Sequence, residues 1–384
     1  MSHPLRADLT LFTYGTVSDG EFLRLSAHVD ECVACGMAVA LLGNVTVHDS
    51  RVHSIAERLM AEMDSSEPAR PGMIADLQDV ELALVRAGAG NRCHKWTVLL
   101  GRILFCEAWL ACNQGDFRFA RRQAAVAKRL FRASGDDFQL GRVLIAEARM
   151  FGQMRQTVRA LAAACAAEEI FVRLGDDRRT RIARSCRAMA ILNAKRFDEA
   201  VALYDELLST AAADDADRHH WLNNLAWCFL ERGETERPKA LALQRGSSEP
   251  LLVSFSWRWI LAECDARQGD LDHAIAQLVS LREDVRARDL RFPAMVIGSR
   301  LSEWLLKLGR AGEAMGIARE VIAYFVSQEL PDRARESIEH LHAQVQTEPT
   351  AACEKLQIFR GQFPSLFNEP RFEWGVAGYL ARAS

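Results

Sequence analysis

The chain has 384 residues, of which 49% are apolar and 26% charged, a composition typical of folded globular proteins rather than disordered ones. The net charge of −3 excludes the overall basic character of most nucleic-acid-binding proteins, so we expect no direct nucleic-acid partner. No apolar run approaches the roughly 20 residues that span a bilayer. Because the first residues also lack a secretory signal pattern, we expect a cytoplasmic protein with no membrane partner.

The first 64 residues differ in charge from the rest of the chain. They contain 4 Lys/Arg and 9 Asp/Glu, a net charge of −5, whereas the remaining residues carry +2. Two helices are expected here, over residues 7–14 and 19–29, with Ser18 as the N-cap of the second. The acidic balance favours a basic partner for this N-terminal region.

A metal-binding pattern follows the second of these helices. His28, Cys32 and Cys35 form the pattern H-x3-C-x2-C, in which two closely spaced thiolates and a histidine one helical turn earlier can hold a tetrahedral ion. His3 is the best candidate for a fourth ligand. The alternative is that the two cysteines are a reduced pair in a helical hairpin without metal.

The pattern and its flanking helices resemble the zinc-binding anti-sigma domain of bacteria, over residues 3–64. The resemblance implies a zinc site of His3, His28, Cys32 and Cys35 in a small four-helix domain. It also implies that the helix after the cysteines wedges into a sigma factor. A third interpretation is a redox sensor, in which oxidation of Cys32 and Cys35 expels zinc.

The helix after the cysteines carries one unbroken apolar stripe at helical spacing. By the resemblance, these side chains would bind the sigma factor, and the alternative is that the helix simply packs on its own domain. The stripe consists of Val52, Ile55, Ala56, Leu59, Met60 and Met63, of which all but Ala56 are the predicted sigma-binding residues.

A polar, proline-containing segment then separates two domains. We expect an anti-sigma-like domain over 1–64, a linker over 65–72, a helical solenoid with capping helices over 73–362, and a C-terminal tail over 363–384. A helix over 73–87 would begin the solenoid. The expected fold class is therefore all-α.

The solenoid is predicted from an internal repeat of 36 to 40 residues. The predicted hairpin turns lie at Gly115, Arg155, Lys195, Gly233, Gly269 and Gly309. Seven residues before these turns stand Ala108, Ala148, Ala188, Ala226, Ala262 and Ser302, and five residues after them stand Ala120, Ala160, Ala200, Pro238, Ala274 and Ala314. Small side chains at fixed distances from a turn let two antiparallel helices approach closely.

This repeat resembles the tetratricopeptide repeat (TPR), with a period longer than the usual 34 of that family, over about residues 97–328. The longer period implies extended second helices or extended connecting loops. Shared repeat positions also predict structural roles for Cys106, Cys186, Cys228, Cys264, Trp221 and Trp257.

By the resemblance, the first helix of each hairpin lines a concave groove. Arginines gather in the first two repeats and carboxylates in the last two, which suits a peptide or protein segment with an acidic part. The predicted partner-binding residues are Arg102, Phe105, Trp109, Arg142, Arg149, Asn223, Trp227, Trp259 and Glu263. The alternative is that the tryptophans only fill the superhelix.

No phosphate loop, catalytic motif or paired-carboxylate site is present in the sequence, so we expect no enzyme. The leading hypothesis is an anti-sigma regulator whose head sequesters an alternative sigma factor while the solenoid binds a second protein or peptide. The alternative is a TPR scaffold that binds a protein partner through its groove and uses zinc only as a structural element.

Overall fold

The computed structural model describes residues 24, 25, 28, 54, 55, 58, 73–75, 77, 78, 94–212, 215, 217–244, 250–334, 336 and 337. Over this part of the chain the secondary structure is helical, as predicted. None of the described helices combines the length and the apolar character that a bilayer crossing requires. The predicted linker 65–72 and the tail 363–384 lie outside the described residues.

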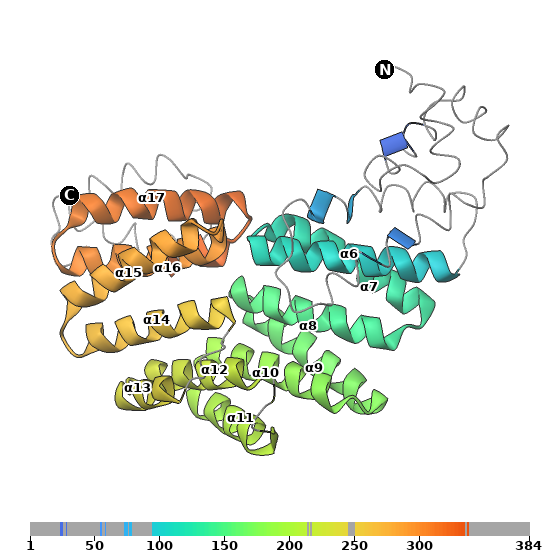
Figure 1. Cartoon of the computed structure of the whole chain (residues 1–384), viewed down its shortest axis with the longest axis horizontal. Coiled ribbons are helices and arrows are strands. Elements are labelled where there is room, and N and C mark those ends of the chain that lie inside the picture. The colour runs from blue at the N-terminus through green and yellow to red at the C-terminus, as the bar shows by residue number, and fades with distance from the viewer. Residues whose placement is uncertain are drawn as a thin grey trace, which may run out of the picture. The chain divides into compact units, whose positions relative to one another are not determined.

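Consecutive helices form antiparallel hairpins (Figure 1). The helices are α6 (His94–Gln114), α7 (Phe117–Ser134), α8 (Asp137–Gln153), α9 (Thr157–Leu174), α10 (Asp177–Asn193), α11 (Phe197–Thr210), α12 (Arg218–Glu231), α13 (Glu236–Leu243), α14 (Leu251–Arg267), α15 (Leu271–Arg286), α16 (Arg291–Lys307) and α17 (Ala311–Ser327). The first helices of the hairpins are α6, α8, α10, α12, α14 and α16.

All six predicted turns have the left-handed backbone conformation that ends a helix, with φ values from 61° at Lys195 to 98° at Gly269. At the first turn, the Asp116 amide donates to the Ala111 carbonyl at 2.8 Å and the Asp116 carboxylate accepts from the Phe119 amide at 2.9 Å. One residue therefore closes one helix and caps the next.

The same left-handed turn, which was not predicted, follows four of the second helices, α7, α9, α15 and α17. Gly135, Gly175, Asp289 and Glu329 also have positive φ. Seven residues separate α11 from α12 and α13 from α14, so the long period comes from long helices in some repeats and from extended loops in others. The 14 to 21 residues of most helices contrast with the 8 of α13, which contains Pro238 in its first turn.

The small residues that flank the turns are buried, as predicted. Ala188, Ala226 and Ala262 have no exposed surface, and the equivalent Ser302 is 2% exposed. On the second helices, Ala120, Ala160, Ala200, Ala274 and Ala314 are also fully buried. A larger side chain at these positions would separate the two helices, because protein interiors leave little free volume.

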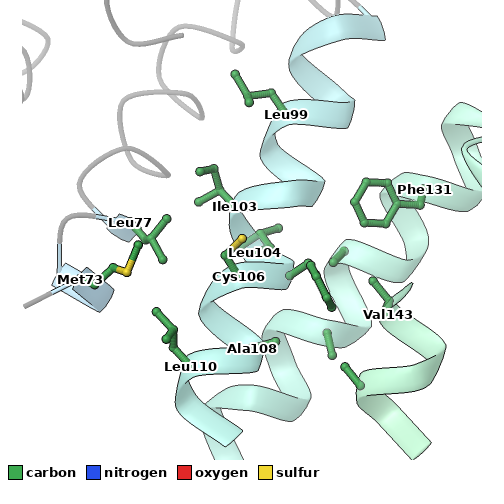
Figure 2. Close-up of a cluster of buried hydrophobic side chains, with 14 of the residues drawn as sticks. Met73, Leu77, Leu99, Ile103, Leu104, Cys106, Ala108, Leu110, Phe131 and Val143 are labelled. Carbon is green, nitrogen blue, oxygen red and sulfur yellow. The ribbon is translucent and has the colours of Figure 1, made fainter. Parts of the chain in front are cut away.

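The chain divides into two compact units. Unit 1 comprises residues 1–148 and 162–183, and unit 2 comprises residues 149–161 and 184–384. In unit 1, Met73 and Leu77 lie beside α6, on the side toward which Ile103 and Leu110 project (Figure 2). In unit 2, separate buried clusters form around Tyr204 and around Trp257.

Candidate functional site

In unit 1, two predicted groove residues contact each other. The Arg142 guanidinium lies 5.0 Å from the centroid of the Phe105 ring, a cation–π distance. Phe105 is buried, whereas Arg142 and Arg102 are half-buried. Trp109 is half-buried and packs against the unit 1 core, so its ring contributes to the packing of α6.

Two buried carboxylates of unit 1 were not predicted. Glu107 and Glu147 lie eight residues before their turns and are 0% and 5% exposed. Lys128 on α7 donates to both oxygens of Glu147, at 2.5 and 2.6 Å, and Gln123 on α7 donates to Glu107. Both carboxylates are therefore bound by side chains of a second helix.

In unit 2, four side chains of α12 and α14 form a continuous arrangement that we call the tryptophan face: Asn223, Trp227, Ser256 and Trp259. The two tryptophan rings meet edge to face, with their centroids 5.4 Å apart. Trp227 Nε1 donates to Ser256 Oγ at 2.9 Å, and Ser256 Oγ donates to Asn223 Oδ1 at 2.7 Å. Both tryptophans and Ser256 are half-buried, so the face remains partly open to solvent.

The hydrogen bonds of the tryptophan face fix the orientation of the Asn223 amide. Because Oδ1 accepts from Ser256, Nδ2 must point the other way. Asn223 is 5% exposed, and its Nδ2 is buried without a hydrogen-bond partner. An unsatisfied buried donor costs about 1–3 kcal/mol, so this orientation of Asn223 is kept at a cost in stability.

The predicted acidic end of the groove is neutralised. Glu263 accepts from Trp259 Nε1 at 3.1 Å and forms a bidentate ion pair with Arg300 on α16, at 2.5 and 2.6 Å. Arg300 also binds Glu303 at 2.7 Å, and Lys307 binds Glu303 at 2.9 Å. The two carboxylates and two cations balance, so the expected acidic late groove is instead a neutral network.

The carboxylates of this network are largely desolvated. The side chains of Glu263 and Glu303 are 3% and 9% exposed. Burial opposes the charged form of Arg300, but Glu263 and Glu303 outweigh it and raise its pKa. Burial likewise opposes ionisation of Glu303, but Arg300 and Lys307 outweigh it and lower its pKa. The sequence signal that could have revealed Arg300 is its spacing of three residues from Glu303 on the same helix.

Arg149 lies close to two residues of neighbouring first helices in unit 2. Burial raises the pKa of the Cys186 thiol, and the Arg149 charge opposes that change. Desolvation of the ring, followed by the charge of Arg149, lowers the pKa of His220. His220 precedes Asn223 by three residues, so the charge of Arg149 acts on a residue one helical turn from Asn223.

Most of the predicted zinc site lies outside the described residues, which include His28 but not His3, Cys32 or Cys35. His28 is helical and half-buried. Among the described residues, no group of three metal-binding side chains comes together. The zinc site therefore stays a prediction.

Of the predicted sigma-binding stripe, Ile55 is described, whereas Val52, Leu59, Met60 and Met63 lie outside the described residues. Ile55 is 3% exposed and belongs to the unit 1 core cluster that includes Leu25, Met73, Leu77 and α6 side chains. In this structure the side chain is therefore used for packing within the chain.

The residues predicted to be structural are buried. Trp221 and Trp257 are each 1% exposed, and Cys228 and Cys264 are fully buried. Burial raises the pKa of Cys228 to about 12 and that of Cys264 to about 11, so both thiols are protonated at neutral pH. Cys106 and Cys186 are also buried, at 6% and 8% exposed, which confirms their packing roles.

Comparison with known proteins adds little to this picture. No family model matches the chain, and no curated protein matches it. A Rap protein complexed with competence and sporulation factor is 10% identical, covering 98% of this chain and 96% of that one, with a TM-score of 0.35.

Two other solved structures are similar. The TPR domain of P58(IPK) is 12% identical, covering 86% of this chain and 97% of that one, with a TM-score of 0.23. A circular tandem repeat protein is 16% identical, covering 98% and 94%, with a TM-score of 0.20. All three TM-scores are below 0.5, so these similarities give no information about the function of this chain.

Proposed function

We propose that this chain is a helical-repeat scaffold that binds an extended protein or peptide segment on the tryptophan face. The observation that carries the proposal is the buried, unpartnered Nδ2 donor of Asn223 beside two half-buried tryptophans. A preformed donor next to apolar surface suits a backbone carbonyl flanked by an apolar side chain. This is the alternative of the two sequence-based hypotheses.

The charges around the tryptophan face indicate the charge that a bound peptide segment would carry. The Glu263–Arg300–Glu303–Lys307 network is balanced, so the α14–α16 end offers no net charge to a ligand. Arg149 supplies a positive charge toward the other end. We therefore expect a segment with an aromatic or large aliphatic residue against Trp227 and Trp259, and an acidic residue toward Arg149.

The test selects binders of the full chain from a displayed library of random peptides and measures their affinity by fluorescence polarisation. Trp259→Ala should weaken binding about tenfold or more, because exposed aromatic anchors carry much of the energy of such interfaces. Asn223→Asp replaces the donor with an acceptor of the same size and should weaken binding by about 3- to 10-fold.

Val158→Ser on α9 is the matched control, because Val158 is 83% exposed and is not part of the tryptophan face. It should leave the affinity unchanged. Thermal unfolding of each variant separates a binding defect from a folding defect, and Asn223→Ala serves as a second variant if Asn223→Asp is unstable. Peptides that bind Trp259→Ala and Asn223→Asp as tightly as the wild-type chain would refute the proposal.

A second proposal concerns residues 1–64, and its support is the H-x3-C-x2-C pattern with His28 in a helix. We propose that His3, His28, Cys32 and Cys35 hold one zinc ion in an anti-sigma-like head, and that the head binds an alternative sigma factor. Because Ile55 is buried against the unit 1 core, sigma binding through the apolar stripe would require that helix to separate from the core.

Two measurements test the second proposal. Metal analysis of the full chain should find about one zinc per chain, and Cys32→Ser with Cys35→Ser should abolish it. Co-expression with sigma factors of the source organism should give a complex that depends on residues 52–63 and not on Trp259. Equal zinc content in wild type and variant would reject the metal site, and no complex with any sigma factor would reject the anti-sigma role.

A further inference from the structure

Arg155 has a backbone conformation that is occupied by glycine at the equivalent position of four other turns. Its φ is 63°, whereas the corresponding residues Gly115, Gly233, Gly269 and Gly309 have the same left-handed geometry without a side chain. A non-glycine residue in this conformation costs about 1–2 kcal/mol. Interactions of the Arg155 side chain can offset that cost.

The Arg155 guanidinium joins two distant parts of unit 2. Its Nε and Nη2 donate to the two carboxylate oxygens of Glu336, at 3.2 and 3.1 Å, a bidentate pair between residues 181 positions apart. Its Nη1 donates to Asn193 Oδ1 at 2.5 Å, at the end of α10. The Asn193 amide in turn donates to the Gly152 carbonyl at 3.3 Å.

A second arginine, Arg333, also joins the segment after α17 to the end of α8. Arg333 Nε donates to the Gln153 carbonyl at 2.7 Å, at the last residue of α8, where helix carbonyls lack partners within the helix. The guanidinium also lies 5.6 Å from the centroid of the Phe292 ring. Its side chain is 12% exposed, so this contact is much better shielded from water than the Arg155–Glu336 pair.

The helical segment that begins at residue 331 is therefore held at two places in unit 2. It contacts the turn at 153–155, and Ser337 forms a hydrogen bond of 2.8 Å with Ser299 on α16. An isolated, exposed ion pair would contribute about 0–1 kcal/mol. Here a bidentate pair, a buried guanidinium and a helix-end carbonyl act together across the same contact.

We propose that residues 331–334, 336 and 337 form a clasp that closes unit 2 by binding the turn at 153–155. The clasp fixes the curvature of the helices from α11 to α17 within unit 2, and with it the spacing of α12, α14 and α16. Opening the clasp would let this array relax like other helical repeats, in which each unit contacts only its neighbours. The proposal does not depend on what the tryptophan face binds.

The test compares Arg155→Gly with Lys195→Gly in the full chain. Both replacements remove the cost of a left-handed non-glycine residue, since Lys195 has a φ of 61° at the equivalent turn. Only Arg155→Gly removes the contact with Glu336. Hydrogen exchange is measured at Ala334–Ser337 and Met154–Gln156, and small-angle X-ray scattering gives the radius of gyration.

Arg155→Gly should speed exchange in both segments about fivefold or more and increase the radius of gyration, whereas Lys195→Gly should change neither. Arg155→Glu should behave like Arg155→Gly, and adding Glu336→Arg should restore slow exchange only in part, because Glu336 also pairs with Arg333 at 3.4 Å. Arg333→Met provides an independent break of the same clasp. Unchanged exchange and radius in both Arg155→Gly and Arg333→Met would overturn the proposal.

Discussion

Buried carboxylates occur on the first helices of both units, but their partners come from different places. In unit 1, Glu147 is bound by Lys128 from the second helix α7. In unit 2, Glu263 is bound by Arg300 from another first helix, α16. The counter-charge in unit 1 therefore joins adjacent hairpins through their first and second helices, whereas in unit 2 it lies along the row of first helices.

This difference changes what the first helices can offer a partner. In unit 1 the first-helix residue Arg142 is half-buried and is stacked over Phe105. In unit 2 the carboxylates Glu263 and Glu303 are balanced by Arg300 and Lys307, and under the proposed function the tryptophans with Asn223 bind the partner. The position thirteen residues before the turn is thus charged in unit 1, at Arg142, and neutral in α14 of unit 2, at Ser256.

The largest predicted effect breaks the ion pair of unit 2. Arg300→Met should destabilise the chain by about 3–5 kcal/mol, because it leaves the buried Glu263 charge uncompensated. Lys128→Met in unit 1 should cost less, since Lys128 pairs with Glu147, whereas Arg300 pairs with both Glu263 and Glu303. Urea unfolding measures both variants, and the double variant Arg300→Met/Glu263→Gln should recover part of the loss.

If Arg300→Met and Lys128→Met shift the unfolding midpoint equally, the proposed difference between the two units is wrong. Arg310→Ala is the surface control. Arg310 pairs with Glu313 at 2.7 Å, but both side chains are well exposed, so its removal should leave the midpoint unchanged.

An intermediate effect is expected from helix packing in unit 1. A Cβ added at Gly141 on α8 would lie 2.6 Å from Phe171 Cζ on α9, far inside normal contact distance. Gly141→Ala should therefore destabilise by about 1–3 kcal/mol. Gly316→Ala on α17 in unit 2 is the matched change, since a Cβ there meets nothing within 4 Å, and it should stabilise by about 0.5–1 kcal/mol.

Thermal unfolding followed by circular dichroism measures both glycine variants. Opposite shifts in the melting temperature would support the packing difference between α8 and α17. A loss of stability in Gly316→Ala, or none in Gly141→Ala, would contradict it.

The smallest effect concerns pH. The pKa of Glu303 is lowered from the ordinary 4.5. Because its folded-state pKa is below the unfolded value, Glu303 contributes stability that is present above about pH 4.5 and is lost as the pH falls through the folded-state pKa. Glu303→Gln should therefore lower stability at neutral pH and make the acid dependence less steep below pH 4.5. Parallel acid profiles of wild type and variant would contradict this role.

The sequence by itself determined the repeat, because its signals are local. A left-handed turn followed by an N-cap, with small residues at fixed distances such as Ala226, specifies where a helix ends and where two helices touch. The same register identified Trp221 and Cys228 as core residues, since equivalent positions in a repeat share an environment. It also placed Asn223, Trp227 and Trp259 at related groove positions, which the structure brings together.

Only the tertiary structure decided which of these side chains are paired with other side chains of the chain. Glu263 was predicted as an acidic groove residue, but its partner Arg300 is 37 positions away, beyond the reach of any local pattern. The same holds for the unpaired Asn223 donor, which depends on Ser256, and for the contact of Arg155 with Glu336. Local spacing fixes the conformation of the backbone, whereas charge pairing and hydrogen-bond satisfaction depend on which helices become neighbours when the repeats stack.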